Sequence, residues 1–256
     1  MLTVQRKQLL MSRLAAEGRL VAKDLAAELA TSEDTIRRDL RELAAAGKLQ
    51  RVHGGALPAS AALADLRGRE SVSVDDKIAL GHHGAALIED GMVVILDGGT
   101  TAVQLARQLR PGLRATIVTH SPNVAIEAAA HPQLEILVLG GRLFRHSMVN
   151  VGAAVIDAAS RLRADLYFMG VTGVHPEAGL TTGDAEEAAV KNALHQRAAE
   201  TVVLASAEKL LAASPFLVAP LDEIARLVVP AATPAKTLRA LKAGAVSVER
   251  CKGTGR

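Results

Sequence analysis

Residues 97–101 carry the chemistry of an anion-binding loop. An apolar run over residues 92–96 ends in Asp97-Gly98-Gly99-Thr100-Thr101, and a helical pattern begins directly afterwards. Glycines let the backbone approach a ligand, and the free N–H groups and the dipole of a helix N-terminus attract negative charge. The pattern therefore predicts a phosphate-binding loop. The alternative that it leaves open is a glycine turn with an ordinary threonine cap.

Two further apolar runs end in small or polar residues. Residues 115–119 end in Thr119-His120-Ser121, and residues 134–139 end in Gly140-Gly141. If the three runs are neighbouring parallel strands, their ends meet at one edge of a sheet, and we expect them to line one pocket. The candidates for neutralising a phosphate there are Lys191 and Lys209, ranked above Lys77, with Arg142 as a further cation and Ser147 as a weaker polar candidate.

The excess positive charge of the chain lies in its first 58 residues. This segment has 10 Lys and Arg against 7 Asp and Glu, whereas the remainder has 20 of each. A small basic module on a neutral body is what binding to the phosphate backbone of nucleic acid requires. On charge alone, a solvated helix face would explain the module equally well.

Helix and turn signals in the basic module predict a winged helix-turn-helix. Helical patterns cover residues 5–17, 21–29 and 32–45, and a short strand over 48–52 precedes the turn Gly54-Gly55. In this motif the N-terminal part of the third helix enters the major groove of double-stranded DNA. The apolar residues of that helix face inward, so we expect the DNA contacts to come from Ser32, Thr35, Arg37, Arg38, Arg41, Lys48, Arg51 and His53.

After about residue 74, apolar runs alternate with helical patterns. The strand-like runs cover 92–96, 115–119, 134–139, 165–170, 201–205, 224–229 and 246–248, and the helical patterns cover 75–89, 101–109, 122–130, 153–160, 185–199 and 234–243. This alternation predicts an α/β domain with a mostly parallel sheet covered by helices on both faces. We therefore expect a winged helix-turn-helix at 1–57, an alanine-rich linker at 58–73 and the α/β domain at 74–251.

Composition excludes several classes of protein. With 256 residues, 49% hydrophobic and 22% charged, the chain is expected to fold into one large or two modest domains. Its single cysteine, Cys251, excludes an intrachain disulfide, and the eight histidines lack metal-ligand spacing, so we expect no metal. The apolar stretches are too short to span a membrane and the N-terminus does not resemble a secretory signal, so we expect a cytoplasmic protein.

The motifs of the basic module resemble the DeoR family of bacterial transcriptional repressors. They are Asp24-Leu25-Ala26, then Ser32-x-x-Thr35-Ile36-Arg37-Arg38-Asp39-Leu40, then His53-Gly54-Gly55-Ala56. The body resembles the effector domain of the same family at Asp97 to Thr101, Thr119-His120-Ser121, Gly140-Gly141, Lys191, and Ser206 to Lys209. The resemblance implies a body related to sugar-phosphate isomerases, a phosphorylated sugar or similar metabolite as effector, and repression of a carbohydrate-metabolism operon, with no cofactor.

Three positions depart from the pattern of that family. Ala30-Thr31 replaces the usual Gly-Val, His120 replaces the common asparagine, and Ser206-Ala207-Glu208-Lys209 replaces the common Asp-Ser-Ser-Lys. The last two changes leave the identity of the effector open.

Two alternatives to a ligand-controlled regulator remain. One is a sugar-phosphate isomerase or deaminase fused to a DNA-binding head, for which Asp184, Glu186 or Glu187 would supply the base. We favour reading these carboxylates as an acidic first helical turn. The other alternative is a body that only dimerises. In either regulatory case, an operator with repeated half-sites requires a homo-oligomer, either a dimer or a tetramer.

Overall fold

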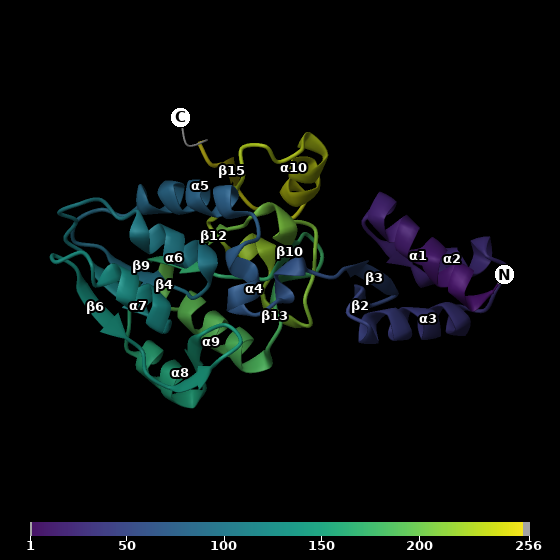
Figure 1. The fold of residues 1–256 in the computed structure, drawn as a ribbon, viewed down its shortest axis with the longest axis horizontal. Coiled ribbons are helices and arrows are strands. Elements are labelled where there is room, and N and C mark those ends of the chain that lie inside the picture. The colour runs from purple at the N-terminus through teal and green to yellow at the C-terminus, as the bar shows by residue number, and fades with distance from the viewer. Residues whose placement is uncertain (1, 253–256) are drawn as a thin grey trace.

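The computed structural model describes residues 2–252, and its first 58 residues form a three-helix head with a small sheet (Figure 1). The helices are α1 (Thr3–Glu17), α2 (Ala22–Glu28) and α3 (Glu33–Ala45), and the antiparallel sheet has the order β1 (Leu20–Val21), β3 (Gly55–Pro58), β2 (Leu49–Val52). Leu10, Leu14, Ile36 and Leu40 are buried between these elements. The strands β2 and β3 form the wing, so the winged helix-turn-helix prediction is confirmed.

Local signals fix the start of α3. The Ser32 Oγ accepts a hydrogen bond from the backbone N–H of Thr35 at 3.2 Å and so caps the helix. Two residues earlier, Ala30 has a φ of +45°, a left-handed conformation that glycine adopts at lower cost. The departure from glycine at this position therefore costs some backbone strain but leaves the cap intact.

The body is built on a seven-stranded sheet in which every pair of neighbours is parallel. Its order is β15 (Val248–Arg250), β14 (Arg226–Val229), β12 (Ala198–Leu204), β9 (Ala164–Met169), β4 (Val93–Leu96), β5 (Thr116–Thr119), β6 (Glu135–Val138). Six of the seven apolar runs in the sequence form strands of this sheet, and the run at 246–248 overlaps β15 at Val248 alone. The predicted mostly parallel sheet is therefore confirmed.

Helices cover both faces of this sheet because its strands are apolar on both sides. In β4, Val94 and Leu96 pack in one hydrophobic cluster, and Ile95 between them packs in the other. The first cluster receives α5 (Val74–Ala85), α6 (Thr100–Arg107) and α7 (Pro122–Ala128), and the second receives α8 (Ala153–Ser160), α9 (Ala185–His195) and α10 (Ala235–Lys242). None of the helices within residues 2–252 has the length and apolar character needed to cross a bilayer.

Several short strands are absent from the sequence prediction. They are the hairpin β7 (Arg142–Phe144) and β8 (Val149–Val151), and the antiparallel sheet of β10 (Gly173–His175), β11 (Gly179–Thr182) and β13 (Phe216–Ala219). In addition, α9 ends at His195, and Ala198 and Ala199 belong to β12 although alanine favours helix. Pairing with β9, which places Ala198 opposite Ala164, overrides that local preference.

Residues 59–73, here called the connector, pack on the body. They contain the short helices η1 (Ala61–Leu63) and α4 (Leu66–Glu70). Leu66 is buried and its backbone N–H donates to the carbonyl of His146 at 2.8 Å. The buried Ser60 donates its hydroxyl to the carbonyl of Thr172. The predicted linker is therefore an ordered segment that packs on the body, with Ala62 and Leu66 buried.

Candidate functional site

The loop after β4 leads into α6 in a conformation that requires glycine. Gly99 occupies the N-cap position of α6 with a φ of +104°, and Gly98 lies so close to Val149 that a Cβ would stand 2.2 Å from its Cγ1. No side chain caps α6, so the N–H groups of its first turn remain available. This is the geometry that an anion-binding helix N-terminus needs.

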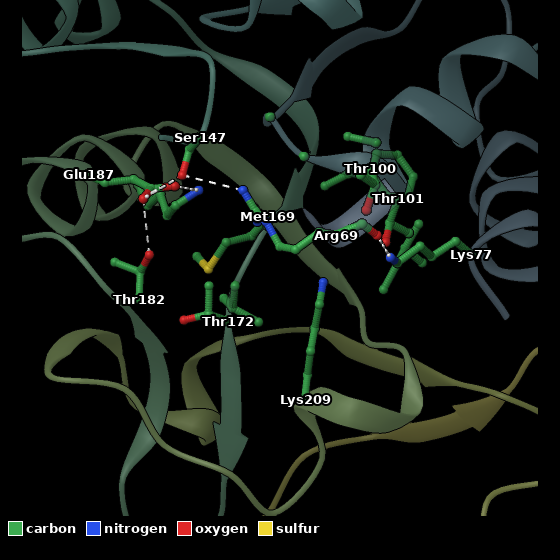
Figure 2. A pocket seen from close by; sticks show the side chains of 18 of the residues that line it. Arg69, Lys77, Thr100, Thr101, Ser147, Met169, Thr172, Thr182, Glu187 and Lys209 are labelled. Carbon is green, nitrogen blue, oxygen red and sulfur yellow. Dashed lines mark hydrogen bonds and ion pairs between the residues drawn. The ribbon is translucent and has the colours of Figure 1, made fainter. Parts of the chain in front are cut away.

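A narrow cavity lies in front of this helix N-terminus (Figure 2). The loop 98–102 forms one wall, and Phe168 to Thr172, at the end of β9 and just after it, form another. Four cations and two carboxylates also line it, namely Arg69, Lys77, Lys191, Lys209, Glu187 and Glu208, together with the hydroxyl groups of Ser147, Thr172 and Thr182. Loops that follow β4, β9 and β12 therefore meet here, as expected at the carboxyl ends of parallel strands.

Two buried polar atoms of the cavity wall have no hydrogen-bond partner within residues 2–252. They are the Thr101 Oγ1 and the Glu208 Oε2. Thr101 is only 7% exposed, so bulk solvent does not satisfy its hydroxyl group. Unpaired buried polar atoms are rare, and at a cavity they indicate a place for a polar ligand or an ordered water.

Asp97 lies beneath the loop and is fully buried. Its carboxylate accepts hydrogen bonds from the Nζ of Lys191, at 2.8 Å to each oxygen, from the Tyr167 hydroxyl at 2.7 Å, and from the His120 Nε2 at 2.8 Å. The backbone N–H groups of Gly98 and Gly170 complete the set. Burial alone would raise the pKa of Asp97, but Lys191 and His120 hold it far below its usual range. Asp97 is therefore a permanent anion that fixes the base of the loop.

Replacing Asp97 with alanine should destabilise the body strongly. The change leaves Lys191 and His120 buried without their shared partner, and breaking such a pair costs about 3–5 kcal/mol. Denaturant unfolding followed by circular dichroism measures this loss. Asp222→Ala, on the exposed helix η3 (Leu221–Glu223), is the control and should change stability by less than about 0.5 kcal/mol. Equal stability of the two variants would contradict this role of Asp97.

Lys191 forms ion pairs with two carboxylates of the protein itself. Besides Asp97, its ammonium group pairs with Glu187 at 3.2 Å, one turn earlier on α9. Burial would lower the pKa of Lys191, but the two carboxylates hold it above its usual value. Lys191 thus lines the cavity, but its charge is already balanced. Of the four cations that line the cavity, Arg69, Lys77 and Lys209 form no ion pair with any residue of 2–252.

The remaining residues that the sequence places in the site lie outside the cavity lining. The hairpin β7–β8 covers the ends of β5 and β6, since Asn150 bonds to the backbone carbonyls of His120 and Leu139. His120 faces Asp97, Ser121 donates to the carbonyl of Met148, and Arg142 forms an exposed ion pair with Glu186. The residues found away from the cavity are Asp97, Thr119, His120, Ser121, Gly140, Gly141 and Arg142.

Sequence reasoning missed Arg69, Glu208 and the role of Glu187 in the cavity. Arg69 falls within the predicted linker, and Glu208 was noted only as a departure from a motif. The usable signal for Glu187 was its position four residues before Lys191, which favours an ion pair on one helix face.

Burial lowers the pKa of Lys209 to about 8, aided by the nearby charges of Arg69, Lys77 and Lys191 and opposed by Glu208. Lys209 is therefore protonated below pH 8 and neutral above it. Between pH 7 and pH 9 a phosphate ester is a dianion, because its second pKa is about 6. We expect phosphate-ester affinity to fall by up to about tenfold between pH 7 and pH 9, measured by titration calorimetry.

Two variants separate this effect from general charge effects. Lys209→Gln should bind more weakly at pH 7 and lose most of the pH dependence. The exposed Lys236→Gln on α10 should behave as the unmodified protein does. An unchanged pH profile in Lys209→Gln would show that another group controls the affinity.

The predicted DNA-contacting residues lie on α3, at its N-cap and at the wing of the head, and most of them are exposed. Arg38 and Arg41 of α3 and Lys48, Arg51 and His53 at the wing are exposed. Arg37 is also exposed and pairs with Glu33 at 2.7 Å, while Ser32 and Thr35 bond to each other at the start of α3. Asp39 is buried and pairs with Arg6 of α1, so it holds the helices together.

Comparison with known proteins covers both parts of the chain. The "DeoR-like helix-turn-helix domain" matches residues 6–61 and the "DeoR C terminal sensor domain" matches residues 72–230. The "HTH-type transcriptional regulator GlpR" of Haloferax volcanii is 34% identical, over 88% of this chain and 88% of its own length. The "Putative aga operon transcriptional repressor" of Escherichia coli O157:H7 is 29% identical, over 96% and 93%.

Solved structures give a weaker likeness. The "Full-length Sorbitol Operon Regulator SorC" of Klebsiella pneumoniae aligns over 92% of this chain and 98% of its own, with a TM-score of 0.42 and 14% identity. The assignment therefore rests on the sequence matches to both domains. These matches are to regulators of transcription, as the resemblance implied, and not to enzymes. The chain belongs to the DeoR family of helix-turn-helix transcriptional regulators.

Proposed function

We propose that this regulator acts in the cytoplasm and represses a carbohydrate-metabolism operon until a phosphorylated sugar binds in the cavity at α6. The observation that carries the proposal is the set of three cations, Arg69, Lys77 and Lys209, without ion pairs around an uncapped helix N-terminus. A dianionic phosphate would receive backbone N–H bonds from α6 and charge from these side chains. One relative is named as an operon repressor, which supports repression rather than activation for this chain.

The opposite wall of the cavity has the groups that a sugar would need. The hydroxyls of Ser147 and Thr182 both donate to the Glu187 Oε2, at 3.3 and 3.2 Å, and Thr172 lies nearby. These groups can exchange hydrogen bonds with sugar hydroxyls, while the cations hold the phosphate. We accordingly assign the effector site to Gly98, Gly99, Thr100, Thr101, Lys77, Arg69, Glu187, Lys191 and Lys209.

On the DNA side, we propose that α3 and the wing contact the operator through the residues named above. Arginine can bind guanine in the major groove or grip a phosphate, and Arg38, Arg41 and Arg51 are exposed for either task. A homo-oligomer, either a dimer or a tetramer, would place two heads on repeated half-sites. Sedimentation equilibrium at micromolar concentration would distinguish these two states.

The test of the proposal combines two measurements on the full chain. Titration calorimetry compares the phosphorylated and unphosphorylated forms of each sugar in a panel. Fluorescence anisotropy then follows binding to an operator selected from random duplexes. We expect one phosphorylated sugar to bind at least tenfold more tightly than its parent and to weaken operator binding. Equal affinity for the two forms, or operator binding that no phosphorylated sugar alters, would contradict the proposal.

A further inference from the structure

Arg69 joins the cavity to the segment that leads from the DNA-binding head. It lies on α4, within the connector, whereas the other three cations of the cavity lie on α5, α9 and η2 (Ala207–Lys209) of the body. Figure 2 shows its side chain crossing the cavity from the Lys77 side toward Ser147, with Lys209 pointing at it from the opposite wall. Arg69 thus occupies the space that a ligand would enter.

The free space in the cavity is too small for a sugar unless a side chain moves. Only about 30 Å³ is open to the centres of water-sized groups, which is room for ordered water and not for a sugar. Interiors are close-packed and side chains occupy defined positions, so entry of a ligand means displacement of a specific group. A charged group with long hydrogen bonds and no ion pair moves more easily than one held in close ion pairs.

Within residues 2–252, two long hydrogen bonds hold the side chain of Arg69. Its Nε donates to the Asp65 carbonyl at 3.4 Å and its Nη2 to the Ser147 hydroxyl at 3.5 Å, both at the limit of a hydrogen bond. Within residues 2–252 it forms no ion pair, and burial lowers its pKa, so the charged guanidinium is under-stabilised. Lys191, in contrast, has two carboxylate partners at 2.8 and 3.2 Å.

The connector links Arg69 to the wing, and hydrogen bonds to the body hold it at several points. At its start, the carbonyl of Pro58, the last residue of β3, accepts a bond from Ala213 at 3.1 Å, and Ser60 bonds to Thr172. At its end, the Lys77 Nζ donates to the carbonyl of Arg69 at 2.6 Å. Thr172 and Lys77 also line the cavity. Ten residues of chain therefore separate β3 from Arg69, and cavity residues hold both ends of that segment.

We propose that Arg69 is the residue that couples effector binding to the DNA-binding head. An anionic ligand would pair with the guanidinium through two parallel hydrogen bonds, and the bond between Arg69 and Ser147 would break. The shift of Arg69 would move α4 and the connector relative to the wing. The effector then has different affinities for the two positions of the connector, which is the requirement for allosteric control. This proposal rests on the proposed function, since it assumes an anion in the same cavity.

Inorganic phosphate serves as the probe, because the effector is unidentified. Operator affinity of the full chain is measured by anisotropy with and without saturating phosphate, with chloride added to equal ionic strength. For the unmodified protein we expect phosphate to change operator affinity by 5- to 150-fold, the usual range of allosteric coupling. Absence of phosphate binding would overturn the proposed function itself.

Two variants separate coupling from binding. Lys209→Met should weaken phosphate binding about tenfold or more but should show the full change in operator affinity once saturated. Arg69→Lys keeps the positive charge and should still bind phosphate, yet the change in operator affinity should fall below twofold because lysine lacks the two-pronged geometry. Full coupling in saturated Arg69→Lys would overturn the role of Arg69.

Hydrogen exchange tests the same idea without any substitution. In the unmodified chain, saturating phosphate should alter exchange of the connector amides, including those of Leu66 and Arg69, which donate backbone hydrogen bonds in the absence of ligand. Exchange at α8, which does not contribute to the cavity lining, should not change. Phosphate binding with unaltered connector exchange would rule out movement of this segment.

Discussion

Replacing Arg38 with alanine is expected to weaken operator binding by about 1–3 kcal/mol, and replacing both Arg37 and Arg38 should weaken it further. Both side chains are exposed on α3 near its N-terminus, the part that meets base edges in this motif. Arg37 is paired with Glu33, so part of its interaction with DNA is offset by loss of that pair. We therefore expect the single change at Arg38 to have the larger effect.

Salt and sequence dependence identify which kind of contact is lost. Loss of a base contact relaxes specificity at one position of the operator, whereas loss of a phosphate contact weakens binding to all sequences and reduces the salt slope by about one. Arg161→Ala at the end of α8, where Arg161 is 79% exposed in its side chain, is the matched control. Wild-type operator affinity in the Arg37→Ala, Arg38→Ala double variant would show that α3 does not bind DNA in this way.

Replacing Gly99 with leucine should abolish the response to effector and leave operator binding intact. A Cβ at Gly99 would meet no atom within 4 Å, so the new side chain extends into the space that a ligand needs in front of α6. The φ of +104° with an extended ψ of 167° adds backbone strain of about 1–3 kcal/mol for a residue with a side chain. Calorimetry with the phosphorylated sugar should show at least a tenfold loss of affinity, and the DNA-binding head should be unaffected because it has its own core.

Gly152 offers a matched control for strain. It also occupies a helix N-cap, at the start of α8, with a φ of +99° and no atom within 4 Å of a Cβ, but it does not line the cavity. Gly152→Leu should therefore carry similar strain and keep effector binding. If both variants lose the effector equally, strain rather than obstruction is responsible. If Gly99→Leu binds normally, the phosphate is held elsewhere.

The inner strands of the main sheet were predictable because they are buried on both faces and appear as continuous apolar runs. The edge strands β6 and β15 are largely exposed or half-buried, and the run predicted at 246–248 overlaps β15 at Val248 alone. The hairpin β7–β8 was not predictable in this way. Its strands have three residues each, and the exposed Arg142 in β7 interrupts any apolar run. The sequence predicts one pocket at the ends of β4, β5 and β6, but this hairpin covers the ends of β5 and β6.

Glycine and hydroxyl spacing alone predict an anion site at loop 98–101, and this loop lines the cavity. The pairing of Lys191 with carboxylates of the protein was not predictable. Asp97 and Lys191 are 94 residues apart in sequence, and only the fold brings the carboxylate to the ammonium group. Arg69 was hidden because alanines and a proline around it resemble a flexible linker, while the buried Leu66 that anchors its helix gave a single weak signal.

The packing of the connector also determines where evolution or an engineer can recombine this protein. Ser60, Ala62 and Leu66 are buried against the body, so a chimaera joined after residue 73 would replace part of the body's own packing with foreign sequence. A junction at Pro58, where β3 ends, exchanges the whole head and keeps those contacts. The head can therefore be exchanged as a unit only at the end of the wing. A grafted head should come under effector control only when the native residues 59–73 stay with the body.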